Sequence, residues 1–443
     1  MGSRAVFGAC GALALALAAS CTLTTSLDGL TSGTNGAGLE GGTPDGTLPE
    51  GAPIGEGGPG STGTVTIAPA GDAPRSTGSP MQGHVLFAER SSRWVAFAFD
   101  GASRRKISTR TSIDFLTWTD GPSIDLPIDH DKDGRNLAVA TAAVGDRDVL
   151  HLSVSLPDSD SDRRHYWVRG TIAGTALTFS PATQVTQTAV REDRLAPDGA
   201  AVGIANDAFV TLFTGWSQGL SPSEPNDGTG NEYAFRSSGA DVGADFTTTW
   251  QKAYLKTVPT ICNARGALAI GSSDLLAFFE KGDEDPRPTN LSWTRGTTNW
   301  SPPADVFEAR RSFDAGDWSA ARLSDADVHA VRLRQDGVVD HRRWNGSSWQ
   351  DGAAIPSESL STGAGLALVK GSTPGSLVLF AVAGGSAIRQ TTWNGTAWSA
   401  WTTRIAAGPS RSALVATDSA TRAAIAWTES GSSGFVVAGA VVR

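Results

Sequence analysis

Residues 344–349 read WNGSSW, and residues 393–398 read WNGTAW. The two phrases begin 49 residues apart, and the related phrase WTRGTTNW begins 51 residues before them, at Trp293. Self-similarity at a fixed period of roughly 20–50 residues is the sequence signature of a repeat architecture. The spacing therefore predicts a structural unit of about fifty residues.

The Asn-Gly pairs at 345–346 and 394–395 indicate the local structure of this unit. Asn-Gly is a strong hairpin signal, because both central residues of a type I′ turn need a positive φ. We therefore place each phrase at the hairpin between the third and fourth strands of its unit. Trp344 and Trp349 then flank the tip of a hairpin, close enough to interact across it.

After Met81 the chain repeats a four-strand pattern in six rounds, and a seventh round supplies only the strands 412–418, 423–431 and 435–442. Near the start, TVTIAP (64–69) has strand character and no partner. A propeller closes when one terminus completes the blade begun by the other, which removes an exposed edge. We therefore predict an all-β fold, a β-propeller of seven four-stranded blades. Six blades are the alternative, if the second and third rounds are irregular.

Composition agrees with this fold class. Only 18% of the residues are charged, and the chain contains 52 Gly and 14 Trp, which favours β-structure rich in turns over helical bundles. Continuous apolar runs such as SLVLFAVAGG (376–385) suit strands that are covered on both faces. The net charge of −9 and the lack of a basic run argue against a nucleic-acid partner.

The N-terminus has the pattern of a secretory signal peptide, too short to span a bilayer comfortably. We assign residues 1–20 to this segment. Its end, LAASC, resembles a bacterial lipobox, although Ala18 stands where that pattern prefers Leu. The resemblance implies lipidation of Cys21 and a lipid-anchored protein of the bacterial cell envelope, in the outer membrane or at the cell surface. An ordinary signal cut near Ala18 or Ala19, and a secreted protein, is the alternative.

Residues 21–63 are predicted to be a disordered tether. They are rich in Gly, Thr and Pro, and no aromatic residue occurs between Phe7 and Phe87. Such a stretch buries too little apolar surface to offset the entropy of ordering. We assign the folded propeller domain to residues 64–443, held away from a membrane by this tether.

The sequence DHDKDG places carboxylates at Asp129, Asp131 and Asp133, followed by Gly134. Alternating carboxylates before a glycine form the first half of a calcium-binding loop of the EF-hand type. The twelfth position is Ala140 rather than Glu, which excludes a complete EF-hand. We therefore expect Ca²⁺ as a possible cofactor and no other; a solvated acidic turn is the alternative.

The Trp-x-Gly-x-x-Trp phrases resemble the repeats of fucose-binding propeller lectins, over roughly residues 230–410. In that family, tryptophans between adjacent blades stack on a sugar beside an arginine and a carboxylate. The resemblance implies Trp293, Trp344 and Trp393 as ligand-binding candidates. An Arg-Glu pair at constant spacing is not reproduced, and packing within the blades is the alternative role for these tryptophans.

SIDFLTW (112–118) resembles the Asp-box of sialidase-type propellers, one residue short and without its glycine. In those families this box is structural, with Asp114 and Ser112 capping a turn while Trp118 packs into the blade. An active sialidase would need three arginines, a Tyr-Glu pair and an acid-base Asp. Glu232 beside Tyr233 is the one neighbouring pair of that kind, and we assign no catalytic residue.

Two functions remain from the sequence. The first is a membrane-tethered binding module for a glycan or a surface protein, acting as a monomer. The second is a sialidase-like glycoside hydrolase on the same scaffold, which would need two suitably spaced carboxylates. Propellers host both functions, so the fold does not choose between them. We expect binding without chemistry.

Overall fold

The structure is a computed structural model, and it describes the chain from Thr64 onward with gaps. The described residues are 64–70, 83–100, 103, 105–127, 136–157, 163–184, 200–205, 208–213, 216–217, 231–237, 250–254, 261–270, 274–281, 287–294, 304–307, 318–419, 421–431 and 434–442. In these ranges all regular structure is β-strand, as the sequence predicts.

The first strands form two antiparallel sheets, each of which follows the order of the chain. The first sheet contains β2 (Val85–Ala88), β3 (Arg93–Phe99), β4 (Lys106–Ser112) and β5 (Thr119–Asp120), with β6 (Ile124–Asp125) paired to β4. The second contains β7 (Asn136–Val144), β8 (Arg147–Pro157), β9 (Arg163–Ala173) and β10 (Ala176–Phe179), with β11 (Thr183–Gln184) paired to β9.

The middle of the chain continues the pattern with shorter pairings. It contains β12 (Ala200–Ala205) with β13 (Ala208–Phe213), and β14 (Trp216–Ser217) with β15 (Asn231–Ser237) and β16 (Trp250–Tyr254). A four-stranded sheet follows, of β17 (Ile261–Ile270), β18 (Asp274–Lys281), β19 (Arg287–Thr294) and β20 (Ala304–Asp305).

The last third holds three regular four-stranded sheets. They are β21 (Trp318–Ser324), β22 (Asp327–Leu333), β23 (Val339–Trp344) and β24 (Trp349–Asp351); then β25 (Leu366–Lys370), β26 (Leu377–Ala383), β27 (Ala387–Trp393) and β28 (Thr402–Ile405); then β29 (Arg411–Asp418), β30 (Ala423–Gly431) and β31 (Gly434–Val441), completed by β1 (Val65–Ala70).

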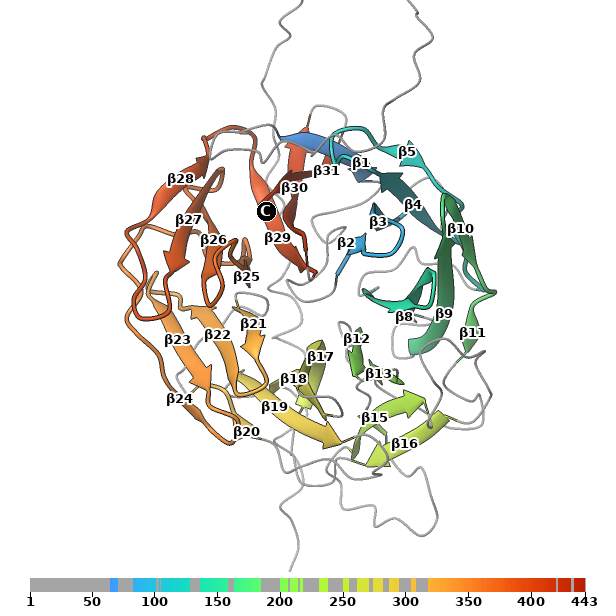
Figure 1. Cartoon of the computed structure of the whole chain (residues 1–443), viewed down its shortest axis with the longest axis horizontal. Coiled ribbons are helices and arrows are strands. Elements are labelled where there is room, and N and C mark those ends of the chain that lie inside the picture. Colours follow the sequence, from blue (N-terminus) through green and yellow to red (C-terminus); the bar gives the residue numbers. More distant parts are fainter. Residues whose placement is uncertain are drawn as a thin grey trace, which may run out of the picture. The chain divides into compact units, whose positions relative to one another are not determined.

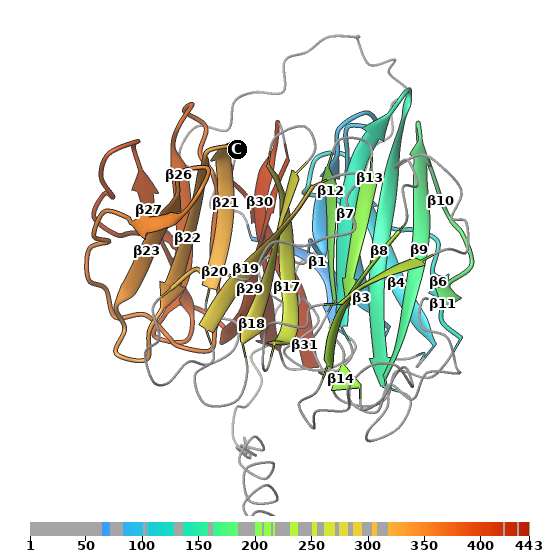
Figure 2. The same cartoon turned by 90° about the horizontal axis from the view of Figure 1, so that it is seen from below.

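Successive sheets of this unit, residues 57–443, meet through their first strands. Contacts run from β2 to β7, β12, β17, β21, β25 and β29 in turn, and β29 contacts β2. Figure 1 shows these strands around a common centre, with later strands such as β4, β9, β23 and β27 further out, and Figure 2 shows the same sheets from the side. This is the arrangement of a β-propeller.

The N-terminal strand completes the last sheet. β1 lies antiparallel to β31, with Val65 opposite Gly439 and Ala70 opposite Phe435. The side chain of Ile67 is fully buried in this position, and the backbone oxygen of Ile67 accepts a hydrogen bond from Arg110 Nη1 of the first sheet at 3.1 Å. The prediction that residues 64–69 supply the missing strand of the last round is confirmed.

Alternation along β26 shows how the core is divided between sheets. Leu377, Leu379 and Ala381 pack in one hydrophobic cluster with residues of the β21–β24 sheet. Phe380 and Val382 pack in another cluster, with residues of the β29–β31 sheet. Successive side chains of a strand point to opposite faces, so a continuous apolar run serves a sheet that is covered on both sides.

Candidate functional site

Three hairpin turns between third and fourth strands share one hydrogen-bonding design. Oδ1 of Asn345 accepts the backbone N–H groups of Ser347 and Ser348, each at 3.0 Å. Asn394 accepts the equivalent pair from residues 396 and 397, and Asp114 the pair from residues 116 and 117 at 2.8 Å. Each acceptor is followed four residues later by a tryptophan. The Asp-box-like segment and the WNG phrases are therefore versions of the same turn.

The residue after the acceptor has a positive φ in all three turns. It is Gly346 (φ 95°), Gly395 (φ 100°) and, in the first sheet, Phe115 (φ 66°). Asn345 and Asn394 themselves do not have a positive φ, so the predicted type I′ turn is wrong: each Asn instead closes a four-residue loop through its side-chain oxygen. Glycine adopts a positive φ without steric cost, whereas a side chain is strained by it. The Phe115 ring is buried and lies 4.8 Å from the Trp94 ring and 5.4 Å from the Trp118 ring, centroid to centroid. Packing holds this residue in a conformation that it would otherwise avoid.

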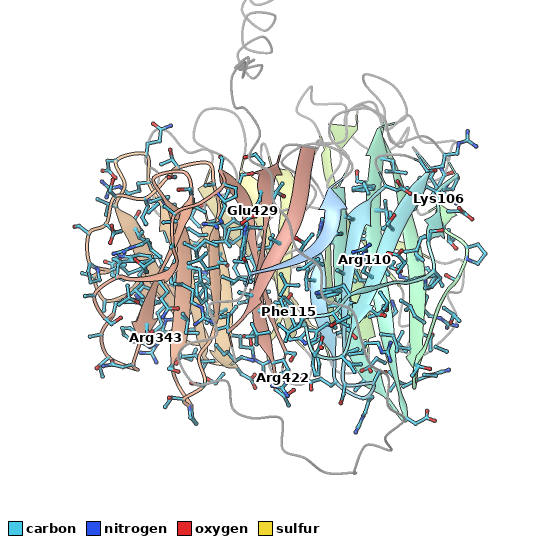
Figure 3. The ribbon with its side chains drawn as sticks, turned by 90° about the horizontal axis from the view of Figure 1, so that it is seen from above. Lys106, Arg110, Phe115, Arg343, Arg422 and Glu429 are labelled. Carbon is cyan, nitrogen blue, oxygen red and sulfur yellow. The ribbon has the colours of Figure 1, made fainter. Side chains whose placement is uncertain are left out.

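These turns lie at what we call the first-turn end of the sheets, where each first strand ends and its second begins. The first-turn end includes residues 89–92, 112–118, 345–348, 394–397, 419 and 421–422. Figure 3 shows Phe115, Arg343 and Arg422 toward this end, and Lys106 and Glu429 toward the other. Short, internally bonded turns make the first-turn end a preorganised surface.

Carboxylates tie neighbouring sheets together at the first-turn end. Asp148 on β8 is buried and accepts the backbone N–H groups of Arg90 at 3.1 Å and Ser91 at 2.8 Å, in the first turn of the preceding sheet. Glu89 makes the same kind of link to Thr421 of the last sheet, and Asp418 to Lys370 of the sheet before it. In each case a carboxylate of one sheet accepts a backbone N–H group of the preceding sheet in the ring.

The tryptophans predicted to bind a ligand are placed as follows. Trp344 is 9% exposed and its ring centroid lies 5.7 Å from that of Trp349 across the hairpin, as predicted. Trp393 is 5% exposed and faces Trp398 at the same separation. Trp293 lies on β19 opposite Leu275, and its side chain is outside what the structure describes. Burial favours the packing role for Trp344 and Trp393, and their binding role stays a prediction.

A buried chain of polar groups lies beside Trp393. His329 Nδ1 on β22 is 2.8 Å from His341 Nε2 on β23, and His329 Nε2 is 3.0 Å from Asp327 Oδ1. Arg343 binds both oxygens of Asp327, at 2.6 and 3.0 Å. Trp398 Nε1, on the next sheet, is 3.2 Å from His341 Nδ1.

Two groups compete for His341 Nδ1. The indole N–H of Trp398 only donates, whereas the backbone oxygen of Ala353, 3.1 Å from the same Nδ1, only accepts. Between the rings, one of His329 Nδ1 and His341 Nε2 carries the proton and the other accepts it. Each ring carries one proton and is neutral. Sequence reasoning missed the pair because the two histidines meet only through the diagonal register of β22 and β23, in which Val331 lies opposite His341.

Electrostatics keep both histidines neutral. Burial lowers the pKa of His329 from 6.5 to about 4, against the opposing effect of Asp327. Burial also lowers the pKa of His341 to about 4, and the neighbouring His329 adds to the effect. The charged imidazolium form is disfavoured because burial removes its hydration.

Two exposed aliphatic side chains stand out in the first of the three turns. Ile113 is 69% exposed and Leu116 is 59% exposed, and both belong to the turn built on Asp114. The backbone N–H of Thr117 is the main cause that holds the pKa of Asp114 below its usual value of 3.8. The carboxylate therefore stays ionised and keeps the turn closed at neutral pH.

Several predicted sites lie outside the described residues. These are Cys21 and the three carboxylates Asp129, Asp131 and Asp133. Within the described ranges, no group of three or more His, Cys, Asp or Glu side chains is placed to hold a metal ion. Glu232 lies on β15 opposite Trp216, with its side chain outside the description. Across the same residues, no helix has the length and hydrophobicity needed to cross a membrane.

Comparison with known proteins adds distant structural similarity. No model of a protein family matches the sequence, and no curated protein matches it. A fucose-specific lectin from Aleuria aurantia, a six-bladed β-propeller, is 14% identical, with 70% of this chain and 96% of the lectin covered and a TM-score of 0.41. Trypanosoma rangeli sialidase bound to the inhibitor DANA is 8% identical, with 85% and 55% covered and a TM-score of 0.46.

These are the two kinds of propeller that the repeats and the Asp-box-like segment resemble. Fucose and the sialidase inhibitor are ligands of those proteins. The sialidase is the longer chain, and the match spans about half of it.

Proposed function

We propose that this chain is a lipid-anchored protein of the bacterial cell envelope whose propeller binds a glycan or a surface protein without changing it. Cys21 carries the anchor, residues 21–63 form the tether, and residues 64–443 form the binding head. The head acts as a monomer. Glycan is the first candidate among the partners, because the turns at residues 345–348 and 394–397 expose mainly hydroxyl and amide groups.

We further propose that the head has seven blades. Six of its sheets each form one blade, and the seventh blade joins β12 and β13 to β14, β15 and β16. Contact between β13 and β15 supports this assignment. So does the order of contacts among first strands, in which β12 follows β7 and precedes β17 as a single member of the ring.

One observation carries the binding proposal: the rigid polar turns of the first-turn end. Residues 345–348 and 394–397 are all exposed, while the tryptophans on both sides of each turn are buried. The side-chain oxygens of Asn345 and Asn394 fix these turns before any ligand arrives. A surface that is already ordered loses little conformational entropy on binding, which favours affinity.

A glycan array probed with the mature chain from Thr22 tests this function. We expect saturable binding to a defined set of glycans, which are recovered unchanged. Asn345→Ala and Asn394→Ala should weaken binding by loosening the turns, while Asn345→Asp, which keeps the acceptor, should not. Catalytic release of sugar from sialosides or arylglycosides, lost in Glu232→Gln, would overturn the proposal. An array without hits would remove the glycan and leave a protein partner.

Cell fractionation tests the anchor separately. The parent chain should sediment with membranes and be released by detergent. Cys21→Ser should appear in the soluble fraction or as the unprocessed precursor, because no acyl chain is attached. Identical fractionation of the two chains would refute lipidation.

A further inference from the structure

The turn at residues 112–118 differs from its two counterparts in what it exposes. Leu116 stands where the other turns carry Ser347 and Thr396. Ile113 directly precedes the acceptor Asp114, where the other turns carry the buried Trp344 and Trp393. Among the residues with described side chains, the exposed large hydrophobics are these two and Val338. Two of the three therefore belong to one turn.

This turn is also held rigidly. Asp114 Oδ1 accepts bonds from Ser112 Oγ at 3.0 Å and from the backbone N–H groups of Leu116 and Thr117. Trp118 Nε1 donates to the backbone oxygen of Phe115 at 3.0 Å. With the Phe115 ring buried beneath it, the turn presents its aliphatic side chains at little further cost in entropy.

The position of the turn relates it to the incoming chain. β1 is antiparallel to β31, and Val441 at the end of β31 lies opposite Ala424, next to the first turn of the last sheet. Val65, where β1 starts, is therefore at the first-turn end. Ile67 of β1 and Phe115 share one hydrophobic cluster. The chain that precedes β1 thus joins the head at the end that carries Ile113 and Leu116.

We propose that Ile113 and Leu116 form a lipid-contacting tip that seats the head on a membrane surface, so that the tether of residues 21–63 permits membrane contact and does not keep the head at a distance. The choice of a lipid partner rests on the proposed lipidation of Cys21. That anchor would place a bilayer at one end of the segment whose other end is β1. Aliphatic side chains on a projecting turn gain free energy by entering the interfacial region. The net charge of −9 opposes attraction to anionic lipids, so the contact is hydrophobic in origin.

Vesicle flotation tests the tip without the acyl anchor. The probe is phosphatidylcholine vesicles, which carry no net charge, mixed with the mature chain from Thr22. The parent should float with the vesicles, and the fraction bound should not fall as salt is raised. The double variant Ile113→Ser/Leu116→Ser should lower the partition coefficient about tenfold or more. Leu116→Trp should keep or strengthen binding, because tryptophan favours the interface.

Val338→Ser is the matched control. Val338 is 41% exposed and lies in the turn between β22 and β23, at the opposite end of the sheets. This variant should float like the parent, and all three variants should unfold at the parent's midpoint, because the replaced side chains are exposed. A parent chain that does not float, or a double variant that floats equally well, would overturn the tip. The cell fractionation of Cys21→Ser is an independent test of the anchor, since no acyl chain is present in the flotation experiment.

Discussion

Phe115 shows how a single residue resolves two opposing demands. The turn after Asp114 needs a positive φ, which Gly346 and Gly395 supply in the equivalent turns at no steric cost. The core between the first and last sheets needs a large side chain at position 115, because the neighbouring Gly439 fills little of the space there. A Cβ at Gly439 would lie 3.0 Å from the Phe115 ring and 2.7 Å from Ile67. Packing outweighs backbone strain at this position.

This balance predicts an inverted order of stability at residue 115. Both Phe115→Ala and Phe115→Gly lose the packing of the ring, at a cost of about 3–5 kcal/mol. Alanine also keeps the strain of a positive φ, which glycine relieves by about 1 kcal/mol. Urea unfolding should therefore find the glycine variant more stable than the alanine variant. An alanine variant that is as stable as the glycine variant, or more so, would contradict the role assigned to φ.

At the scale of elements, the hairpin of β22 and β23 concentrates buried polar groups. Its two histidines complete a chain from Arg343 through Asp327 to Trp398 on the neighbouring sheet. Because both rings are neutral in the folded protein, acid destabilises this hairpin. The folded pKa of about 4 lies below the ordinary value of 6.5, so the unfolded chain takes up protons first.

The stability contributed by this pair is present above pH 6.5 and lost as the pH falls toward 4. Between pH 6.5 and pH 4, each histidine lowers the free energy of unfolding by about 1.4 kcal/mol for every unit by which the pH falls. Urea unfolding at pH 7.5, 5.5 and 4.5 should show this loss in the parent chain. The double variant His329→Gln/His341→Gln, which has no titrating ring at either position, should show a shallower dependence. Parallel curves for the two proteins would contradict the neutral pair.

The elements were more accessible to sequence reasoning than the contacts between them. The positions of the WNG turns and the unpaired TVTIAP strand were predictable because hairpin signals and strand alternation are local patterns. The type of the turn was not, since Asn345 and Asn394 act through their side chains and not through a positive φ. The relation between the Asp114 turn and the Asn345 turn was hidden, since Phe115 stands where the other turn has Gly346 and Ile113 where it has Trp344. The histidine pair depends on strand register, which single-sequence patterns leave open. Burial of Trp344 depends on packing against Leu276 and Phe278 of the preceding sheet, a contact between sheets that the repeat pattern does not show.

At the scale of the whole molecule, the calcium prediction concerns the connection between the first two rounds. Asp129, Asp131 and Asp133 provide the carboxylate oxygens that calcium prefers. Thermal unfolding in millimolar calcium should occur at a higher temperature than in chelator, because a ligand of the folded state stabilises it. Asp131→Asn should remove most of that difference. Equal unfolding temperatures with calcium and with chelator would refute the site.

The closure of the head by its first strand is the central structural claim. β1 joins the last sheet and accepts a hydrogen bond from Arg110 of the first, so it holds together the two ends of a ring of sheets. Ile67 is fully buried at this junction, whereas the adjacent Thr66 points to solvent. The same strand therefore offers one position that closure requires and one that it tolerates.

Urea unfolding of Ile67→Asp beside Thr66→Asp tests closure most directly. The account predicts that Ile67→Asp lowers the free energy of unfolding by about 3–5 kcal/mol, because it loses a buried side chain and places a carboxylate in an apolar cluster. Thr66→Asp, with the same charge one residue away, should change it by less than about 0.5 kcal/mol. Equal and small effects of the two substitutions would contradict the claim that the first strand closes the propeller.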